Sequence, residues 1–202
     1  LGWFNDPVLP GMLSWSESRL ANTLFHELAH VTLWLPGSVS FNESFASFVG
    51  DVSAERYLVH TYGEDSEEVA EERDRVHDRR VFRLLMTELY KDLDAVYTDD
   101  TLSDVDKLQR KDLLLRGLPA RVRAADLHRA EGYLHYVQAE PWNNARLAQF
   151  RTYNKGPEHF ALLLEQEGGD LQAFFARLDA LCAGADDPYE ALAEAVGETP
   201  EE

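Results

Sequence analysis

Apolar residues recur with the period of an α-helix between positions 15 and 35. At about 100° per residue, one side of that helix carries Leu20, Leu24, Leu28, Val31 and Leu35. The opposite side carries His, Asn and Leu where the outer face of an ordinary surface helix would carry mostly charges; its residues are Arg19, Asn22, His26, His30 and Leu33. We therefore expect a helix over residues 15–35 that protein covers on both sides.

Polar and turn-forming residues mark the ends of this helix and the start of a second one. Ser14 or Ser16 is suited to cap the first helix, and Ser14 has the spacing to Glu17 that a capping box requires. The Pro-Gly pair at 36–37 ends it. Asn42 is suited to cap a second helix over residues 43–62.

Small residues occupy the side of the second helix that begins at Glu43. They are Ser47, Gly50 and Ala54. Small side chains allow the backbones of two helices to approach closely, so we expect this helix to pack tightly against the first. Glu43 would then lie beside the histidines.

The remainder of the chain also has helical periodicity. We expect helices over residues 64–97, 102–128, 143–153, 158–167, 171–182 and 189–196, with an irregular aromatic segment over 132–142. The first two of these should form an antiparallel hairpin. The predicted fold is mainly α, a single domain over residues 1–202, in which a zincin-like helical core is wrapped by the long hairpin and the C-terminal helices. Any β-structure should be small and near residues 1–12.

Composition excludes several classes of function. The formal net charge of −18 opposes binding to nucleic acid and to anionic lipid, and it favours substrates that carry a positive amino group. No apolar run approaches the roughly 18 residues that a membrane span needs. A single cysteine, Cys182, excludes an internal disulfide and a Cys-rich structural zinc site, and it leaves the compartment undecided.

The candidate chemistry lies in these first two helices. His26, Glu27 and His30 form an H-E-x-x-H motif, which places two imidazoles on one helical face. With Glu43 they make a His₂Glu ligand set for Zn²⁺ that leaves the fourth position for water, as in a catalytic zinc site. Glu27 points about 100° away from His26 and is suited to act as a general base on that water.

Hydrolysis through a tetrahedral intermediate also needs a donor for the developing oxyanion. Tyr153 is our first candidate, ahead of His159 and His135. Hydrolysis of a peptide bond is the main hypothesis. A metalloendopeptidase or another amide hydrolase is one alternative, because it would use the same site. A non-enzymatic helical module, which holds zinc for structure or holds none, is another.

Four stretches of the chain resemble a bacterial family of predicted aminopeptidases, which are zinc metallopeptidases of the gluzincin type. They are Ser14-Trp-Ser-Glu, Leu20-Ala-Asn-Thr-Leu-Phe-His-Glu-Leu-Ala-His, Phe41-Asn-Glu-Ser-Phe-Ala-Ser-Phe-Val-Gly and Asn143-Asn-Ala-Arg-Leu. The resemblance implies His26, His30 and Glu43 as zinc ligands, Glu27 as catalytic base and a peptide as substrate. Aminopeptidase specificity rests on the resemblance alone, and the sequence does not indicate the oligomeric state.

The resemblance also carries two expectations about the whole protein. Sequences of this family continue further towards the N-terminus, commonly behind an export signal, so this chain would be a C-terminal, metal-bearing part from the periplasm or cell envelope. Better-known gluzincins place an aspartate one turn after the ligand glutamate to hold a ligand histidine. Here Ser47 occupies that position, and Asp51 follows one turn later. The residue that orients the histidines is therefore left open.

Overall fold

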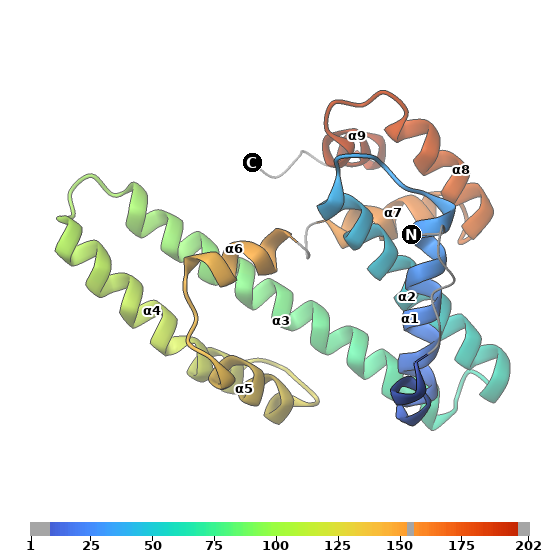
Figure 1. Cartoon of the computed structure of the whole chain (residues 1–202), viewed down its shortest axis with the longest axis horizontal. Coiled ribbons are helices and arrows are strands. Elements are labelled where there is room, and N and C mark those ends of the chain that lie inside the picture. The colour runs from blue at the N-terminus through green and yellow to red at the C-terminus, as the bar shows by residue number, and fades with distance from the viewer. Residues whose placement is uncertain (1–8, 153–155, 198–202) are drawn as a thin grey trace. The chain divides into compact units, whose positions relative to one another are not determined.

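The computed structural model describes residues 9–152 and 156–197, and within them the regular elements are helices (Figure 1). They are, in order, η1 (Pro10–Ser14), α1 (Glu17–Thr32), α2 (Val39–Tyr62), α3 (Glu67–Thr98), α4 (Asp104–Ala124), α5 (Ala130–Ala139), α6 (Asn144–Thr152), α7 (Pro157–Gln166), α8 (Leu171–Cys182) and α9 (Pro188–Val196). The mainly α class is thus confirmed. Of the stretch where a little β-structure was expected, residues 9–12 are described, and Pro10 begins a 3₁₀ turn there.

Contacts within the chain divide it into two compact units. The first unit comprises Leu1–Val69 and Tyr153–Glu202, and the second comprises Ala70–Thr152. The organisation of residues 1–202 as a single domain stays a prediction.

The first unit is built around the pair formed by α1 and α2, with α7 packed on α2 and with α8 and α9 beside α7 (Figure 1). Aromatic rings fill its core, because α2 places Phe41, Phe45 and Phe48 against Phe160 and Phe174. Phe41, Phe45, Phe160 and Phe174 are almost completely buried. This packing holds α2 from the side opposite α1.

The leucine side of α1 differs from the prediction. Leu24, Leu28 and Val31 are 41%, 58% and 65% exposed, whereas Leu20 and Leu35 are half-buried, so the described residues leave the middle of this face uncovered. The histidine side is the covered one, because α2 packs against it. The expectation that protein covers both faces was therefore wrong for the described part of the chain.

The cap of α1 is one of the two predicted residues, whereas the start of α2 differs from the prediction. Ser16 caps α1 by accepting a hydrogen bond from the Arg19 amide, whereas the Ser14 hydroxyl donates to the carbonyl of Gly11. Asn42 is not an N-cap, because α2 begins earlier, at Val39. Its buried amide instead bridges the turn: Nδ2 donates to the Leu35 carbonyl, and Oδ1 accepts from the Leu35 amide.

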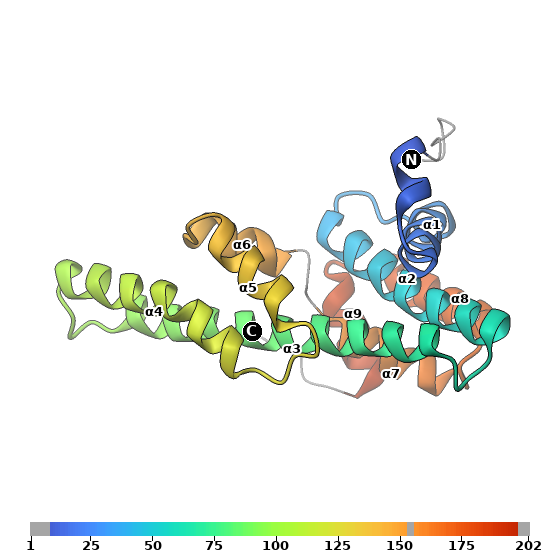
Figure 2. The same cartoon turned by 90° about the horizontal axis from the view of Figure 1, so that it is seen from below.

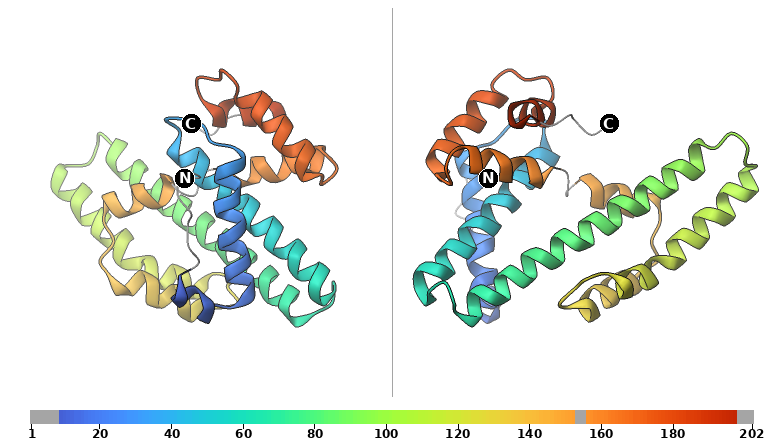
Figure 3. Two further views of the ribbon diagram at one scale, coloured as in Figure 1. Left: turned by 45° about the vertical axis from the view of Figure 1, so that its right-hand side comes forward. Right: turned by 180° about the vertical axis from the view of Figure 1, so that it is seen from behind.

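The second unit contains α3 from Ala70 onwards, together with α4, α5 and α6. Helices α3 and α4 run antiparallel, as predicted (Figures 2 and 3), and Arg121 of α4 pairs with Asp92 of α3 at 2.5 Å. Their shared core includes Leu89, Leu118 and Val137. The segment predicted to be irregular contains α5, because Leu134 and Val137 face this core and the aromatic residues around them pack on helices.

Candidate metal centre

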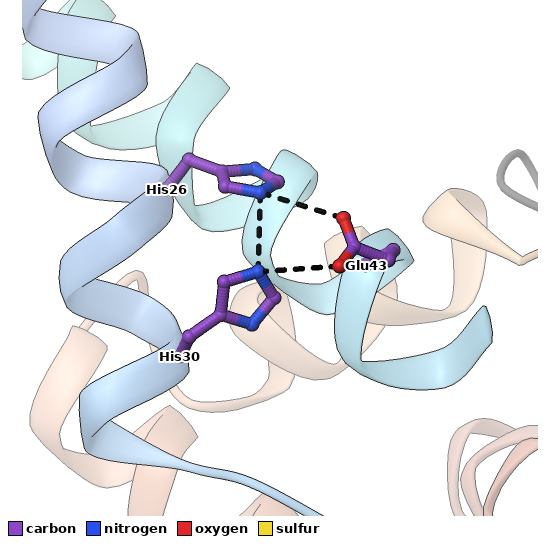
Figure 4. Close-up of side chains that lie close together, drawn as sticks. All are labelled: His26, His30 and Glu43. Atoms are coloured by element: carbon purple, nitrogen blue, oxygen red, sulfur yellow. Dashed lines mark hydrogen bonds and ion pairs between the residues drawn. The ribbon is translucent and has the colours of Figure 1, made fainter. Parts of the chain in front are cut away.

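The described structure brings together the three side chains that the sequence proposed as ligands (Figure 4). His26 Nε2 and His30 Nε2 of α1 lie 3.1 Å apart. The two carboxylate oxygens of Glu43, on α2, lie 3.6 Å from one imidazole nitrogen each, Oε2 from His26 and Oε1 from His30. Four potential ligand atoms therefore surround one point.

These separations match those around a small tetrahedral ion. Ligand atoms bound to zinc at 2.0–2.1 Å in tetrahedral geometry are about 3.3 Å from one another. The separations of 3.1, 3.6 and 3.6 Å differ from that value by about 0.3 Å or less, with each nitrogen facing a different oxygen of the one carboxylate. A proton shared between the two imidazoles would also account for these contacts, since it would attract the carboxylate, but the donor types are those of a His₂Glu metal centre. The donor set thus fits a divalent metal with His₂Glu ligation.

A glycine allows the two helices to approach. A Cβ atom added at Gly50 would lie 3.0 Å from the carbonyl oxygen of Asn22 and 3.4 Å from the Cβ of His26. The predicted close packing of the small-residue face is confirmed at this position. Ala54 on the same face is fully buried. Larger side chains here would hold α2 away from α1 and move Glu43 away from the histidines.

Burial sets the electrostatics of the pair. The His30 side chain is 2% exposed, against 21% for His26 and 29% for Glu43. Burial, and secondly the neighbouring His26, lower the pKa of His30 below its usual range, although the charges of Glu43 and Glu27 oppose this shift. The neutral imidazole, which is the form that binds a metal, is therefore favoured at His30. Solvent reaches the group of three side chains from the side of His26 and Glu43, because both are partly exposed.

Comparison with known proteins adds the family to this geometry. The model of the family described as "Putative aminopeptidase" matches residues 1–191. The chain belongs to this family. No curated protein and no solved structure matches the chain.

In this member of the aminopeptidase family, Asp51 is engaged with a residue that the sequence reasoning did not single out. Asn22 Nδ2 donates to Asp51 Oδ1 at 2.7 Å, and Asn22 lies one turn before His26 on the same face. His30 Nδ1 is buried and has no hydrogen-bond partner among the described residues, so Asp51 does not orient that nitrogen. Ser47 is exposed. The position of Asn22 one turn before the motif was the available signal.

Trp34 was also missed. Its ring meets the edge of the His30 ring at a centroid distance of 5.6 Å, and 45% of the residue is exposed. It follows His30 by one helical turn, although α1 itself ends at Thr32. An exposed aromatic surface beside the histidines is suited to contact an apolar part of a substrate.

The other residues proposed from the sequence are Glu27, Tyr153, His159 and His135. Glu27 is half-buried on α1, and its charge acts on His30. Tyr153 lies outside the described residues. His159 is half-buried on α7, His135 is exposed on α5, and neither belongs to the group formed by His26, His30 and Glu43. No helix in the described ranges is long and apolar enough to cross a membrane.

Proposed function

We propose that this protein hydrolyses peptide bonds with a zinc ion held by His26, His30 and Glu43, in the manner of a gluzincin aminopeptidase. The observation that carries the proposal is the set of ligand-atom separations, 3.1 and 3.6 Å, which fits tetrahedral zinc. The family description supports a peptidase, and an aminopeptidase in particular.

Bound zinc would polarise the scissile carbonyl and lower the pKa of a water molecule towards neutrality. The residues of the chain supply the proton transfers. Glu27 takes a proton from the attacking water and returns it to the leaving amine. Tyr153 is the proposed hydrogen-bond donor to the oxyanion that develops on the former carbonyl.

The neutral state of His30 suits this arrangement. A protonated imidazole cannot bind a metal, so the lowered pKa of His30 keeps this ligand competent in weakly acidic solution. Glu43 lies in the second turn of α2, where Val39 is the first residue. The helix N-terminus adds a smaller favourable field for its ionised carboxylate there, because the dipole effect weakens beyond the first turn.

Recognition of a free amino terminus fits the charge of the chain. The net charge of −18 attracts the α-ammonium group of a peptide. Trp34, which is 45% exposed beside His30, is proposed to contact an apolar side chain of the substrate. We assign no single carboxylate to the amine.

The deciding experiment combines metal analysis with a Glu27→Gln variant. The purified native chain should hold zinc at His26, His30 and Glu43, and Glu27→Gln should retain that zinc while peptidase activity falls by about 10²–10⁴-fold. Glu68→Gln is the matched control: it removes the same charge at an exposed position at the start of α3 and should change neither property. Native protein that binds no zinc, or a Glu27→Gln variant with full activity, would refute the proposal.

Substrate comparison separates the two kinds of peptidase. An aminopeptidase should cleave a peptide with a free amino terminus and leave its N-acetylated form intact, because the acetyl group removes the positive charge. Equal cleavage of both peptides would indicate a metalloendopeptidase with the same centre. Tyr153→Phe should retain zinc and lower kcat, and unchanged kcat would exclude Tyr153 as the oxyanion donor.

A further inference from the structure

The second unit contains another group of side chains with metal-binding chemistry. His77 and Asp78 of α3 and His128 of the connection between α4 and α5 each offer a ligand atom, and these atoms all lie within 4.8 Å of one another. The residues come from positions about 50 apart in the sequence. None of them belongs to the centre formed by His26, His30 and Glu43.

The cluster is held in place by its own hydrogen bonds. Asp78, which is 1% exposed, accepts from the backbone amides of His128 at 2.7 Å and Arg129 at 2.9 Å. His77 Nε2 lies 2.9 Å from the backbone carbonyl oxygen of Asp126. These contacts fix the connecting loop against α3 and place His128 beside His77, with ring centroids 5.0 Å apart.

Two further carboxylates face the imidazoles. Asp74 Oδ1 lies 3.5 Å from His128 Nε2, and Asp126 Oδ2 lies 3.7 Å from His77 Nε2. Asp74, His77 and Asp78 have the i, i+3, i+4 spacing that places them on one face of α3. The group therefore offers two imidazoles and three carboxylates.

We propose that this cluster is a second metal site, which binds Zn²⁺ or a similar divalent transition metal through His77, His128 and Asp78. Imidazole favours such ions over Mg²⁺ and Ca²⁺, which prefer oxygen ligands. Asp74, whose Oδ1 lies 3.5 Å from His128 Nε2, is within reach as a fourth ligand. The ligand atoms of a bound zinc ion lie about 3.3 Å from one another, whereas those of His77, Asp78 and His128 lie within 4.8 Å of one another. The side chains of His77 and His128 are 40% and 48% exposed, so they can rotate to shorten these distances.

The metal would join α3 to the connection between α4 and α5. Asp78 already holds the backbone of this loop by hydrogen bonds, and they account for its burial without a metal. The two imidazoles and the two other carboxylates also face one another, as His–Asp pairs at 3.5 and 3.7 Å. A bound metal would link these side chains and stabilise the second unit, independently of any catalysis in the first.

The test uses the full chain, stripped of metal and titrated with Zn²⁺ against a chromophoric chelator. The native protein should bind two zinc ions, and a His26→Ala/His30→Ala variant should keep one of them. Adding His77→Gln or His128→Gln to that variant should weaken the remaining site at least about tenfold, since even residues outside the ligand shell contribute that much. His135→Gln, at an exposed histidine of α5, is the matched control and should bind like its parent.

Thermal unfolding gives a second readout. Zn²⁺ should raise the melting temperature of the His26→Ala/His30→Ala variant, and this rise should disappear with His77→Gln. Glutamine keeps a donor for the Asp126 carbonyl, so His77→Gln should fold, which far-UV circular dichroism checks. Co²⁺ bound to the parent variant should give a visible spectrum that His77→Gln and His128→Gln lose.

Two results would overturn the proposal. One is a His26→Ala/His30→Ala variant that binds no zinc at about 100 µM, a concentration far above the dissociation constants of specific zinc sites. The other is zinc binding that His77→Gln and His128→Gln leave unchanged. Both tests are separate from the proposed peptidase activity, which His77→Gln and His128→Gln should not alter in otherwise native protein.

Discussion

Replacing Gly50 by alanine tests how the approach of α1 and α2 forms the metal centre. The added Cβ would lie 3.0 Å from the backbone carbonyl oxygen of Asn22 and 3.4 Å from both Asn22 Nδ2 and the His26 Cβ. Ordinary van der Waals contacts to a Cβ are 3.4–4 Å. A backbone oxygen within α1 cannot rotate away, so the two helices must separate by a few tenths of an ångström.

Two opposing effects decide the magnitude. Overpacking of this kind costs about 1–3 kcal/mol, whereas alanine is a better helix former than glycine by about 1 kcal/mol. Gly117→Ala isolates the second effect, because a Cβ at Gly117 in α4 would meet nothing within 4 Å. We therefore expect Gly50→Ala to be less stable than Gly117→Ala by about 1–3 kcal/mol, which corresponds to about 2–12 °C in melting temperature for a chain of this size.

Chemical denaturation of both variants measures this difference. Hydrogen exchange locates the change in stability of each variant in the helices that carry the substitution. This is needed because α1 and α2 belong to one unit and α4 to the other. Gly50→Ala should also bind zinc more weakly, because the displaced α2 carries Glu43. A Gly50→Ala variant as stable as Gly117→Ala, with native zinc affinity, would refute the packing argument.

Three further changes test other features of the first unit. Asn42→Ala should lower the free energy of unfolding by about 1–3 kcal/mol, measured by urea denaturation, because it leaves the Leu35 amide and carbonyl without the bonds that Asn42 makes; a neutral effect would contradict this. Burial raises the pKa of Cys182 to about 11. At pH 8 only about one thiol in a thousand is then ionised, so alkylation should be slow in the folded chain, fast in urea, and faster as the pH rises towards 11. Rapid alkylation of folded protein at pH 8 would show the thiol to be accessible. Leu28→Gln should change stability by no more than about 0.5 kcal/mol, since Leu28 is 58% exposed, and a larger loss in thermal unfolding would mean that protein covers this face.

Local patterns predicted most helices because a helix depends on neighbouring residues. Asp170 and Asp187, which precede the helices expected over 171–182 and 189–196, cap α8 and α9. Helical periodicity and capping residues did not predict a helix in the short aromatic segment. Helix α5 was missed for this reason, because its stability comes from the burial of Leu134 and Val137 in the core of the second unit.

The centre of His26, His30 and Glu43 shows how far sequence reasoning can reach. The i, i+4 spacing places both imidazoles on one face of α1, and this follows from helical geometry alone. Placing Glu43 required only a short turn and a small-residue face on the next helix. The spacing placed Asn22 on the histidine face, but it did not pair Asn22 with Asp51, since the two are 29 positions apart and their bond depends on how the two helices are aligned.

The sequence by itself therefore determined most of the helices, several of their caps and the ligand set of His26, His30 and Glu43, because these depend on side-chain chemistry and on contacts within a few positions. Tertiary structure alone decided which face of α1 is covered, what Asn42 holds, and which histidines lie together. His77 and His128 are 51 positions apart and share no motif, so only the packing of the connecting loop on α3 brings them to one place. Contacts between distant residues depend on the whole packing arrangement, which no local pattern records.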